Sequence, residues 1–83
     1  MLGSDGTGCR IMGTITICND TTGIIHVSVT AADESGDQGC CDIQPGDTES
    51  WIRTYSQVAF ALREDNGHMV TIVVRPGQDY VIG

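Results

Sequence analysis

Apolar and polar residues alternate along most of this chain. Isoleucine, valine and other apolar residues recur at every second position in four stretches, at residues 11–17, 25–29, 58–62 and 70–74. Alternation of β-branched residues is typical of half-buried antiparallel strands, and no window keeps a helical period. The pattern therefore predicts an all-β domain, a small antiparallel β-sandwich of about six or seven strands.

The same alternation assigns a face to each expected strand and so predicts the core. Successive side chains of a strand point to opposite sides, so one apolar set must face inward. The expected core residues are Ile15, Ile17, Ile25, Val27, Val29, Val58, Phe60, Leu62, Val70, Ile72 and Val74.

Asparagine and glycine mark the expected hairpins. Asn66–Gly67 is a strong hairpin signal, because both central residues of a type I′ turn need positive φ. It predicts a hairpin in which Val58–Glu64 pairs with Met69–Arg75. The segment at 19–23, NDTTG, predicts a second hairpin between the first two strands.

Two Pro-Gly pairs mark two further turns. Pro45–Gly46 opens the stretch PGDTESWI, and Pro76–Gly77 opens PGQDYVI, so each turn precedes a short stretch with an aromatic residue. This echo indicates either a repeated architecture or only the common way in which sheets turn, and the second explanation is the simpler.

The length of 83 residues fits one domain with a modest core. We expect residues 10–83 to form the sandwich and the Gly-rich residues 1–9 to be flexible. No stretch approaches the ~20 apolar residues of a membrane span. The first residues lack the basic and apolar regions of a signal peptide. We expect an extracellular protein, with a cytoplasmic protein that has no signal peptide as the alternative.

The net charge restricts the partners. Eleven acidic residues against four basic ones give a net charge of -7. Such a chain is repelled by nucleic acid and by anionic membranes, so we expect a neutral ligand or another protein. The segment Asp33–Asp47 is acidic and has no base, and Asp33, Ser35 and Asp37 alternate as in a calcium loop. The loop departs from that motif in its glycine and its last ligand, which favours a solvated acidic loop.

Two of the four cysteines, Cys40 and Cys41, are neighbours. In an extended segment they point to opposite sides. A straight strand from Cys9 to Cys18 is about 30 Å long, whereas a disulfide needs Cα atoms within about 7 Å. Both outer cysteines therefore cannot pair with the neighbouring two in one chain unless the strand bends. If the first two strands form a hairpin, Cys9 is the reachable partner.

Cys18 and one loop cysteine then remain. They are either free thiols or a cross-link between two chains; four reduced cysteines, a vicinal Cys40–Cys41 disulfide and a zinc site are further alternatives. Zinc would need Cys18 to approach the other cysteines, and there is no C-x₂-C spacing. We predict no metal site and no cofactor.

The stretch SWIRTY carries the candidate binding residues. In an extended chain Trp51, Arg53 and Tyr55 share one face and Ile52 lies on the other. If Ile52 faces the core, the three form an outward row suited to stacking on a sugar and hydrogen-bonding its hydroxyls. The alternative is that Trp51 fills the core and Ile52 lies outside.

Signals for enzymatic chemistry and for modification are weak. His26 and His68 are the only histidines, and neither stands in a nucleophile motif, so we expect no enzyme. Asn19-Asp20-Thr21 fits the N-glycosylation pattern, which also arises often by chance.

The pattern I-x-I-x-N-x-T-x-x-x-I-x-V occurs at Ile15, Ile17, Asn19, Thr21, Ile25 and Val27. Through this pattern the chain resembles small fungal β-sandwich proteins without a signal peptide, akin to the aegerolysins and the actinoporin-like fruiting-body lectins. The resemblance implies a defence or recognition protein. Neither pore formation nor a particular sugar is implied, because the chain is shorter and lacks the aromatic-rich lipid-binding loops.

These observations together predict a non-enzymatic binding or defence protein that recognises a carbohydrate or another neutral surface ligand. The alternative is a small toxin-like or protein-binding effector that acts as an oligomer. A homodimer is expected in either case, because a small sandwich has a marginal core and exposed strand edges. The dimer interface should avoid the acidic segment Asp33–Asp47.

Overall fold

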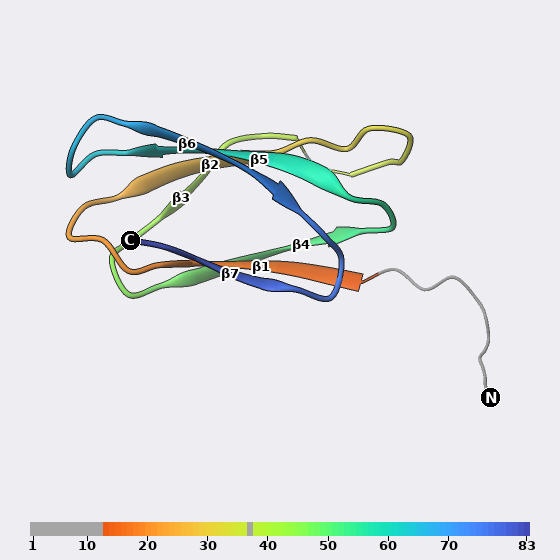
Figure 1. Ribbon diagram of the computed structural model, residues 1–83, viewed down its shortest axis with the longest axis horizontal. Helices are drawn as coiled ribbons and strands as arrows, with labels where there is room; N and C mark the ends of the chain where they lie inside the picture. Colours follow the sequence, from red (N-terminus) through yellow and green to blue (C-terminus); the bar gives the residue numbers. More distant parts are fainter. Residues whose placement is uncertain (1–12, 37) are drawn as a thin grey trace.

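The computed structural model describes residues 13–36 and 38–83, which form two β-sheets packed face to face (Figure 1). A three-stranded sheet has the order β4-β1-β7 and a four-stranded sheet the order β3-β2-β5-β6. The strands are β1 (Gly13–Asn19), β2 (Ile25–Val29), β3 (Cys41–Ile43), β4 (Thr48–Arg53), β5 (Gln57–Arg63), β6 (Met69–Val74) and β7 (Asp79–Ile82).

This architecture confirms the predicted all-β sandwich. Its pairs are antiparallel except for β1 and β7, which run parallel. Over the described ranges, no helix is long and apolar enough to cross a membrane. The expected flexible segment 1–9 and the expected start of the domain at residue 10 lie outside the described residues.

The first two strands do not form the predicted hairpin. β1 pairs with β4 and β7, whereas β2 pairs with β3 and β5 in the other sheet. The segment NDTTG therefore carries the chain from one sheet to the other. Alternation identifies the buried face of a strand but not the strand that it pairs with. The same pattern is therefore compatible both with a hairpin and with a connection between the two sheets.

A buried asparagine builds this crossing. Asn19 is 0% exposed. Its Nδ2 donates to the carbonyls of Gly23 and Ile43 at 2.8 and 2.7 Å, and its Oδ1 accepts from Thr21 N and Thr21 Oγ1 at 2.8 and 2.6 Å. The side-chain amide is thus fully used inside the fold, so the glycosylation pattern at Asn19 is not accessible in the folded protein.

The two Pro-Gly turns make equivalent connections. Gly46 and Gly77 have φ of 84° and 85°, as the glycine of a type II turn requires. Each turn leads from the four-stranded to the three-stranded sheet. Gly46 N donates to Asn19 O at 2.8 Å, and Gly77 N donates to Thr14 O at 3.0 Å. The echo in the sequence therefore has a structural counterpart, since the strands after the two turns lie on either side of β1.

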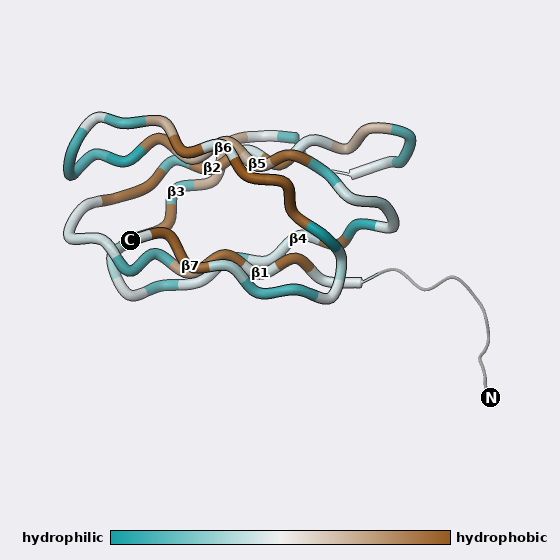
Figure 2. Tube along the Cα trace, in the orientation of Figure 1, coloured by the Kyte–Doolittle hydropathy of each residue, from teal (hydrophilic) through white to brown (hydrophobic). Residues whose placement is uncertain are grey.

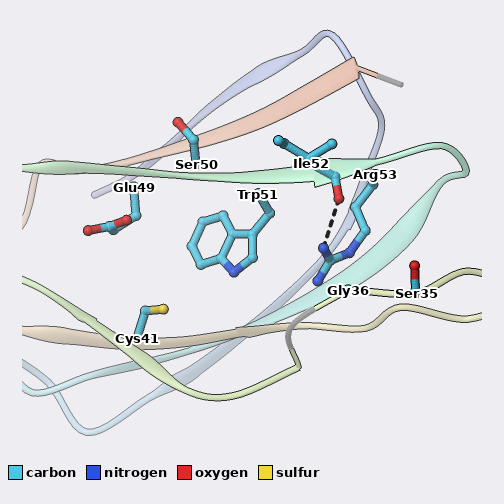
Figure 3. A pocket seen from close by; sticks show the side chains of 8 residues that line it. All are labelled: Ser35, Gly36, Cys41, Glu49, Ser50, Trp51, Ile52 and Arg53. Atoms are coloured by element: carbon cyan, nitrogen blue, oxygen red, sulfur yellow. Dashed lines mark hydrogen bonds between the residues drawn. The ribbon is translucent and has the colours of Figure 1, made fainter. Parts of the chain in front are cut away.

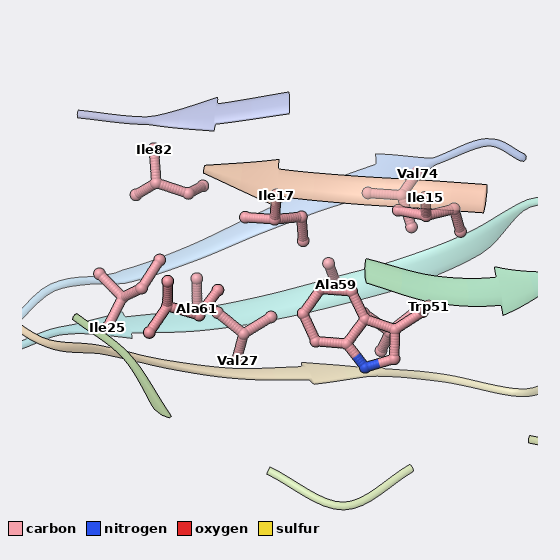
Figure 4. Packing of buried hydrophobic residues seen from close by; sticks show 11 residues of the cluster. Ile15, Ile17, Ile25, Val27, Trp51, Ala59, Ala61, Val74 and Ile82 are labelled. Carbon is pink, nitrogen blue, oxygen red and sulfur yellow. The ribbon is translucent and has the colours of Figure 1, made fainter. Parts of the chain in front are cut away.

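The core lies between the two sheets, where apolar side chains from both meet (Figure 4). Apolar stretches occur along strands of both sheets (Figure 2). The predicted core positions of β1, β2 and β6 are confirmed. Val70 and Ile72 are partly buried against the cluster. The fully buried predicted residues are Ile15, Ile17, Ile25, Val27, Val29 and Val74.

The prediction that Val58, Phe60 and Leu62 of β5 face the core was wrong. Phe60 and Leu62 are 40% and 39% exposed, and Val58 is half-buried on the same outward face. Their neighbours Ala59 and Ala61 are buried instead. The strand is therefore rotated so that its larger apolar side chains face away from the other sheet.

The register with β2 explains this orientation. Ala59 lies opposite Val29 and Ala61 opposite Val27, and residues that pair across a sheet share a face. The two valines face the core, so the two alanines must do so as well. Small side chains here also leave interior volume for the indole of Trp51, which belongs to the same cluster (Figure 4).

The predicted hairpin of β5 and β6 is confirmed, with Leu62 opposite Met69 at its turn end. The prediction of a type I′ turn at Asn66–Gly67 was wrong. Gly67 has φ of 73°, but Asn66 has no positive φ, so the turn is not type I′. A longer loop closes instead, with Gly67 N donating to Arg63 O at 2.8 Å.

Gly67→Val is expected to destabilise the protein by about 1–3 kcal/mol, because a β-branched residue resists positive φ. A side chain at this position would meet nothing within 4 Å, so the cost is conformational rather than steric. Urea unfolding measures it, with Gly67→Asn as the control that tolerates this backbone region. Equal stability of the Val variant and the natural protein would contradict the turn assignment.

Candidate functional site

A pocket opens between the edges of the two sheets. β4 is an edge strand of the three-stranded sheet and β3 is an edge strand of the four-stranded sheet. The pocket has a volume of about 500 Å³ and is lined by Ser35, Gly36, Cys41 and residues 49–53 (Figure 3). This volume is within the range of about 300–1,000 Å³ that holds small-molecule ligands.

Alternation along β4 decides which side chains face the pocket. Figure 3 shows Glu49, Trp51 and Arg53 on its inner side, with Ser50 and Ile52 pointing away. Ile52 is 61% exposed and Trp51 only 5%. The outward row, which required Ile52 in the core, is therefore not found, and the other arrangement, with Trp51 inside and Ile52 outside, is correct.

Pairing with β1 is the reason for this orientation. Trp51 lies opposite Ile15, which faces the core, so Trp51 faces the core too. The indole both completes the core cluster and lines the pocket. Its Nε1–H makes no hydrogen bond to any residue of the described chain. Because the indole lines the pocket, this donor is available to an acceptor bound there.

Arg53 is 2% exposed and its guanidinium is directed at backbone carbonyls. Nε donates to Thr30 O at 2.9 Å, Nη1 to Ile52 O at 2.9 Å and Nη2 to Val29 O at 3.2 Å. Arg53 thus holds the end of β2 against β4. Its main contribution to the pocket is to shape one end.

Glu34 fastens the segment after β2 to the β4–β5 turn. Its carboxylate accepts from Thr54 N at 2.5 Å, Tyr55 N at 3.0 Å and Gln57 Nε2 at 2.6 Å. Burial acts to raise the pKa of Glu34, but these hydrogen bonds and the charge of Arg53 outweigh it and lower the pKa. The contacts hold the loop that forms one wall of the pocket.

The structure separates the three predicted binding residues. Trp51 and Arg53 both line the pocket, whereas Tyr55 is 54% exposed in the β4–β5 turn and does not line it. Glu49 was missed by sequence reasoning. Glu49 could have been found from the sequence, because it stands two residues before Trp51 and such residues share a face of a strand.

A second polar cluster lies on the outer face of the four-stranded sheet. His26 Nδ1 is 2.6 Å from Asp42 Oδ1 and His26 Nε2 is 2.5 Å from Glu64 Oε2. The hydrogen bond with Asp42, followed by that with Glu64, raises the pKa of His26. The register of β2 with β3 brings His26 opposite Asp42. No motif in the sequence predicts that these two residues pair.

The neighbouring cysteines lie on opposite sides of their segment. Cys41 packs against the core and lines the pocket, and Cys40 is exposed beside His26. Cys18 is half-buried in β1, and no disulfide joins any two of these three described cysteines. Cys9 lies outside the described residues, so its pairing stays a prediction.

Glu34→Gln is expected to lower the melting temperature at neutral pH, because an amide NH₂ then faces N–H donors. A carboxyl with a lowered folded-state pKa stabilises above its ordinary pKa of 4.5 and loses that contribution as the pH falls through its folded pKa. The difference between variant and natural protein should therefore shrink in acid. Melting curves from neutral pH down to about 3 measure it.

Glu49→Gln, the same chemical change at an exposed acid of β4, is the control and should show no such convergence. A Glu34→Gln difference that stays constant across this pH range would contradict the role of the Glu34 carboxylate.

No family model, no curated protein and no solved structure matches this chain. The resemblance to small fungal β-sandwich proteins therefore stays a prediction. The pocket and the polar cluster around His26 are the two candidate functional features of the described residues.

Proposed function

We propose that this protein is a non-enzymatic binding module that holds a neutral, hydroxyl-rich ligand, a carbohydrate, in the pocket beside Trp51. One observation carries the proposal, namely that Trp51 lines the pocket while its indole N–H has no acceptor among residues 13–36 and 38–83. A ligand hydroxyl would accept this hydrogen bond.

The other groups at the pocket complement a sugar. A sugar hydroxyl both donates and accepts, so it needs partners of both kinds. The Glu49 carboxylate supplies an acceptor on the same side of β4 as the indole (Figure 3). β4 is an edge strand, which offers backbone N–H and C=O groups to a ligand. The apolar part of the indole suits the C–H face of a sugar ring.

Charge supports a neutral ligand. The chain has a net charge of -7, and Glu49 adds a negative charge at the pocket itself. The single arginine of the pocket, Arg53, already donates to protein carbonyls. Anionic ligands would be repelled, whereas a neutral sugar meets no such penalty.

The arrangement of His26 supports a binding role over catalysis. Both of its ring nitrogens are held by carboxylates, Asp42 on one side and Glu64 on the other. A cysteine nucleophile would need one of these nitrogens to take the proton of the nearby Cys40 thiol, whereas both hydrogen-bond to carboxylates instead. The pocket itself is lined by no histidine.

A glycan array with neutral mono- and oligosaccharides tests the proposal, followed by calorimetry with the best glycan. Glu49→Ala and Trp51→Phe should each weaken binding by about tenfold or more, since each removes one hydrogen-bonding partner, worth about 1.4 kcal/mol. Both are mild changes, whereas Trp51→Ala would cost about 3–5 kcal/mol of stability and obscure the result.

Tyr55→Phe is the matched control, because Tyr55 lies outside the pocket. It should bind like the natural protein. The proposal fails if no glycan binds, or if Tyr55→Phe weakens binding while the two pocket variants keep it.

An oligomeric effector is the second candidate function, and one observation favours it. The outward side chains of β5 and β6 are mostly apolar and carry no charge, so this part of the sheet offers an apolar surface to a second copy of the chain. β6 is also an edge strand. The partner that we propose for this face is a second copy of the chain. The face consists of Val58, Phe60, Leu62, Met69, Thr71 and Val73.

Light scattering in reductant tests this homodimer. The natural protein should be a dimer and Val73→Lys a monomer, because the lysine would place two charges in the interface. Val81→Lys is the matched control, since Val73 and Val81 are similarly exposed, at 60% and 64%, but lie on opposite sheets. A monomeric natural protein, or a dimer broken only by Val81→Lys, would contradict the proposal.

A further inference from the structure

Three metal-ligating side chains converge on the outer face of the four-stranded sheet. Cys40 and Asp42 are two residues apart in an extended segment, so they share a side. Asp42 pairs with His26 across the β2–β3 register. One ligand atom from each of the three residues lies within 4.8 Å of the other two.

We propose that His26, Cys40 and Asp42 form a zinc-binding site. A set of imidazole nitrogen, thiolate sulfur and carboxylate oxygen matches the ligands that Zn²⁺ takes in proteins. Calcium and magnesium prefer oxygen ligands alone, so the same set disfavours them. Three protein ligands leave the fourth tetrahedral position for water.

The side-chain geometry needs only small changes. Zinc ligands at about 2.0–2.3 Å from the metal lie roughly 3.3–3.6 Å from one another in a tetrahedron. The His26–Asp42 pair, now 2.6 Å apart, must open by about 1 Å, and the sulfur must close by about 1 Å from a separation of at most 4.8 Å. Cys40 and Asp42 are exposed, so both adjust without disturbing the core.

Glu64 has a separate part in this site. It holds His26 Nε2 at 2.5 Å, which leaves the other nitrogen, Nδ1, on the side of Asp42. A carboxylate that accepts from the far nitrogen of a zinc-bound imidazole orients the ring and makes it a better ligand. Glu64 is therefore a positioning residue rather than a ligand.

The zinc site is distinct from the sugar pocket. His26 and Cys40 lie on the outer side of the sheet, whereas Cys41 lines the pocket. The adjacent cysteines thus provide a matched pair of variants. Cys40→Ser should remove zinc binding, and Cys41→Ser should leave it unchanged within a few-fold.

Zinc affinity is measured on the full chain without an affinity tag, in a thiol-free reductant, by competition with a chromophoric chelator. One equivalent of Zn²⁺ should bind. Cys40→Ser and His26→Gln should weaken binding by about 100-fold or more, and Glu64→Gln by about 10–100-fold. Cobalt(II) in place of zinc should show a thiolate-to-metal charge-transfer band that Cys40→Ser abolishes and Cys41→Ser retains.

Circular dichroism of each variant verifies the fold. Three results would overturn the zinc site: no zinc binding at equimolar, micromolar concentrations, a cobalt complex without the thiolate band, or equal losses in the two cysteine variants. The glycan measurements are independent of these, so either proposal can fail while the other stands.

Discussion

The fold depends on a buried amide at the point where the chain changes sheets. Asn19 ends β1, and every polar group of this residue is engaged, because its N–H also donates to Asp47 O at 2.9 Å and its carbonyl accepts from Gly46 N at 2.8 Å. A buried polar group that loses its partner costs about 1–3 kcal/mol. Replacement of this one side chain would leave several groups without partners at once, which is a large share of the stability of a small domain.

A second polar cluster, formed by the buried Arg53 and Gln57 and the half-buried Glu34, closes the other end of the sandwich. Gln57 is 3% exposed, and its Oε1 accepts from Thr30 Oγ1 and Ala32 N at 2.7 and 2.9 Å. The two polar clusters hold the sheets at both ends. The indole of Trp51 lies between them, where the edge strands leave the pocket open. The pocket thus lies between edge strands β3 and β4, while the two polar clusters close the ends of the sandwich.

The sequence was sufficient for the faces of β1 and β2, because their apolar residues alternate mostly with polar ones. It was insufficient for β5, where both faces are apolar and the larger side chains suggested the wrong one. Burial there is decided by pairing with Val27 and Val29 of β2. The same reasoning explains Trp51, whose orientation follows from its pairing with Ile15.

The functional candidates were harder to predict for a related reason. The cluster of His26 with Asp42 and Glu64 exists only because three strands meet in one register, and a single sequence carries no record of strand pairing. The only role that the sequence suggested for the Asn19 side chain was that of an N-glycosylation acceptor. Its real use, a buried amide with every hydrogen-bonding site engaged, depends on the carbonyls of Gly23 and Ile43, and Ile43 lies far along the chain.

Strand β3 links the two candidate sites to the buried amide. It has only three residues, and a strand so short contributes little stability of its own. Cys41 faces the pocket, Asp42 faces the His26 cluster, and Ile43 is buried with its carbonyl bonded to Asn19 Nδ2 at 2.7 Å. The position of β3, and with it the geometry of both sites, therefore rests on its pairing with β2, on the burial of Ile43 and on this hydrogen bond to Asn19.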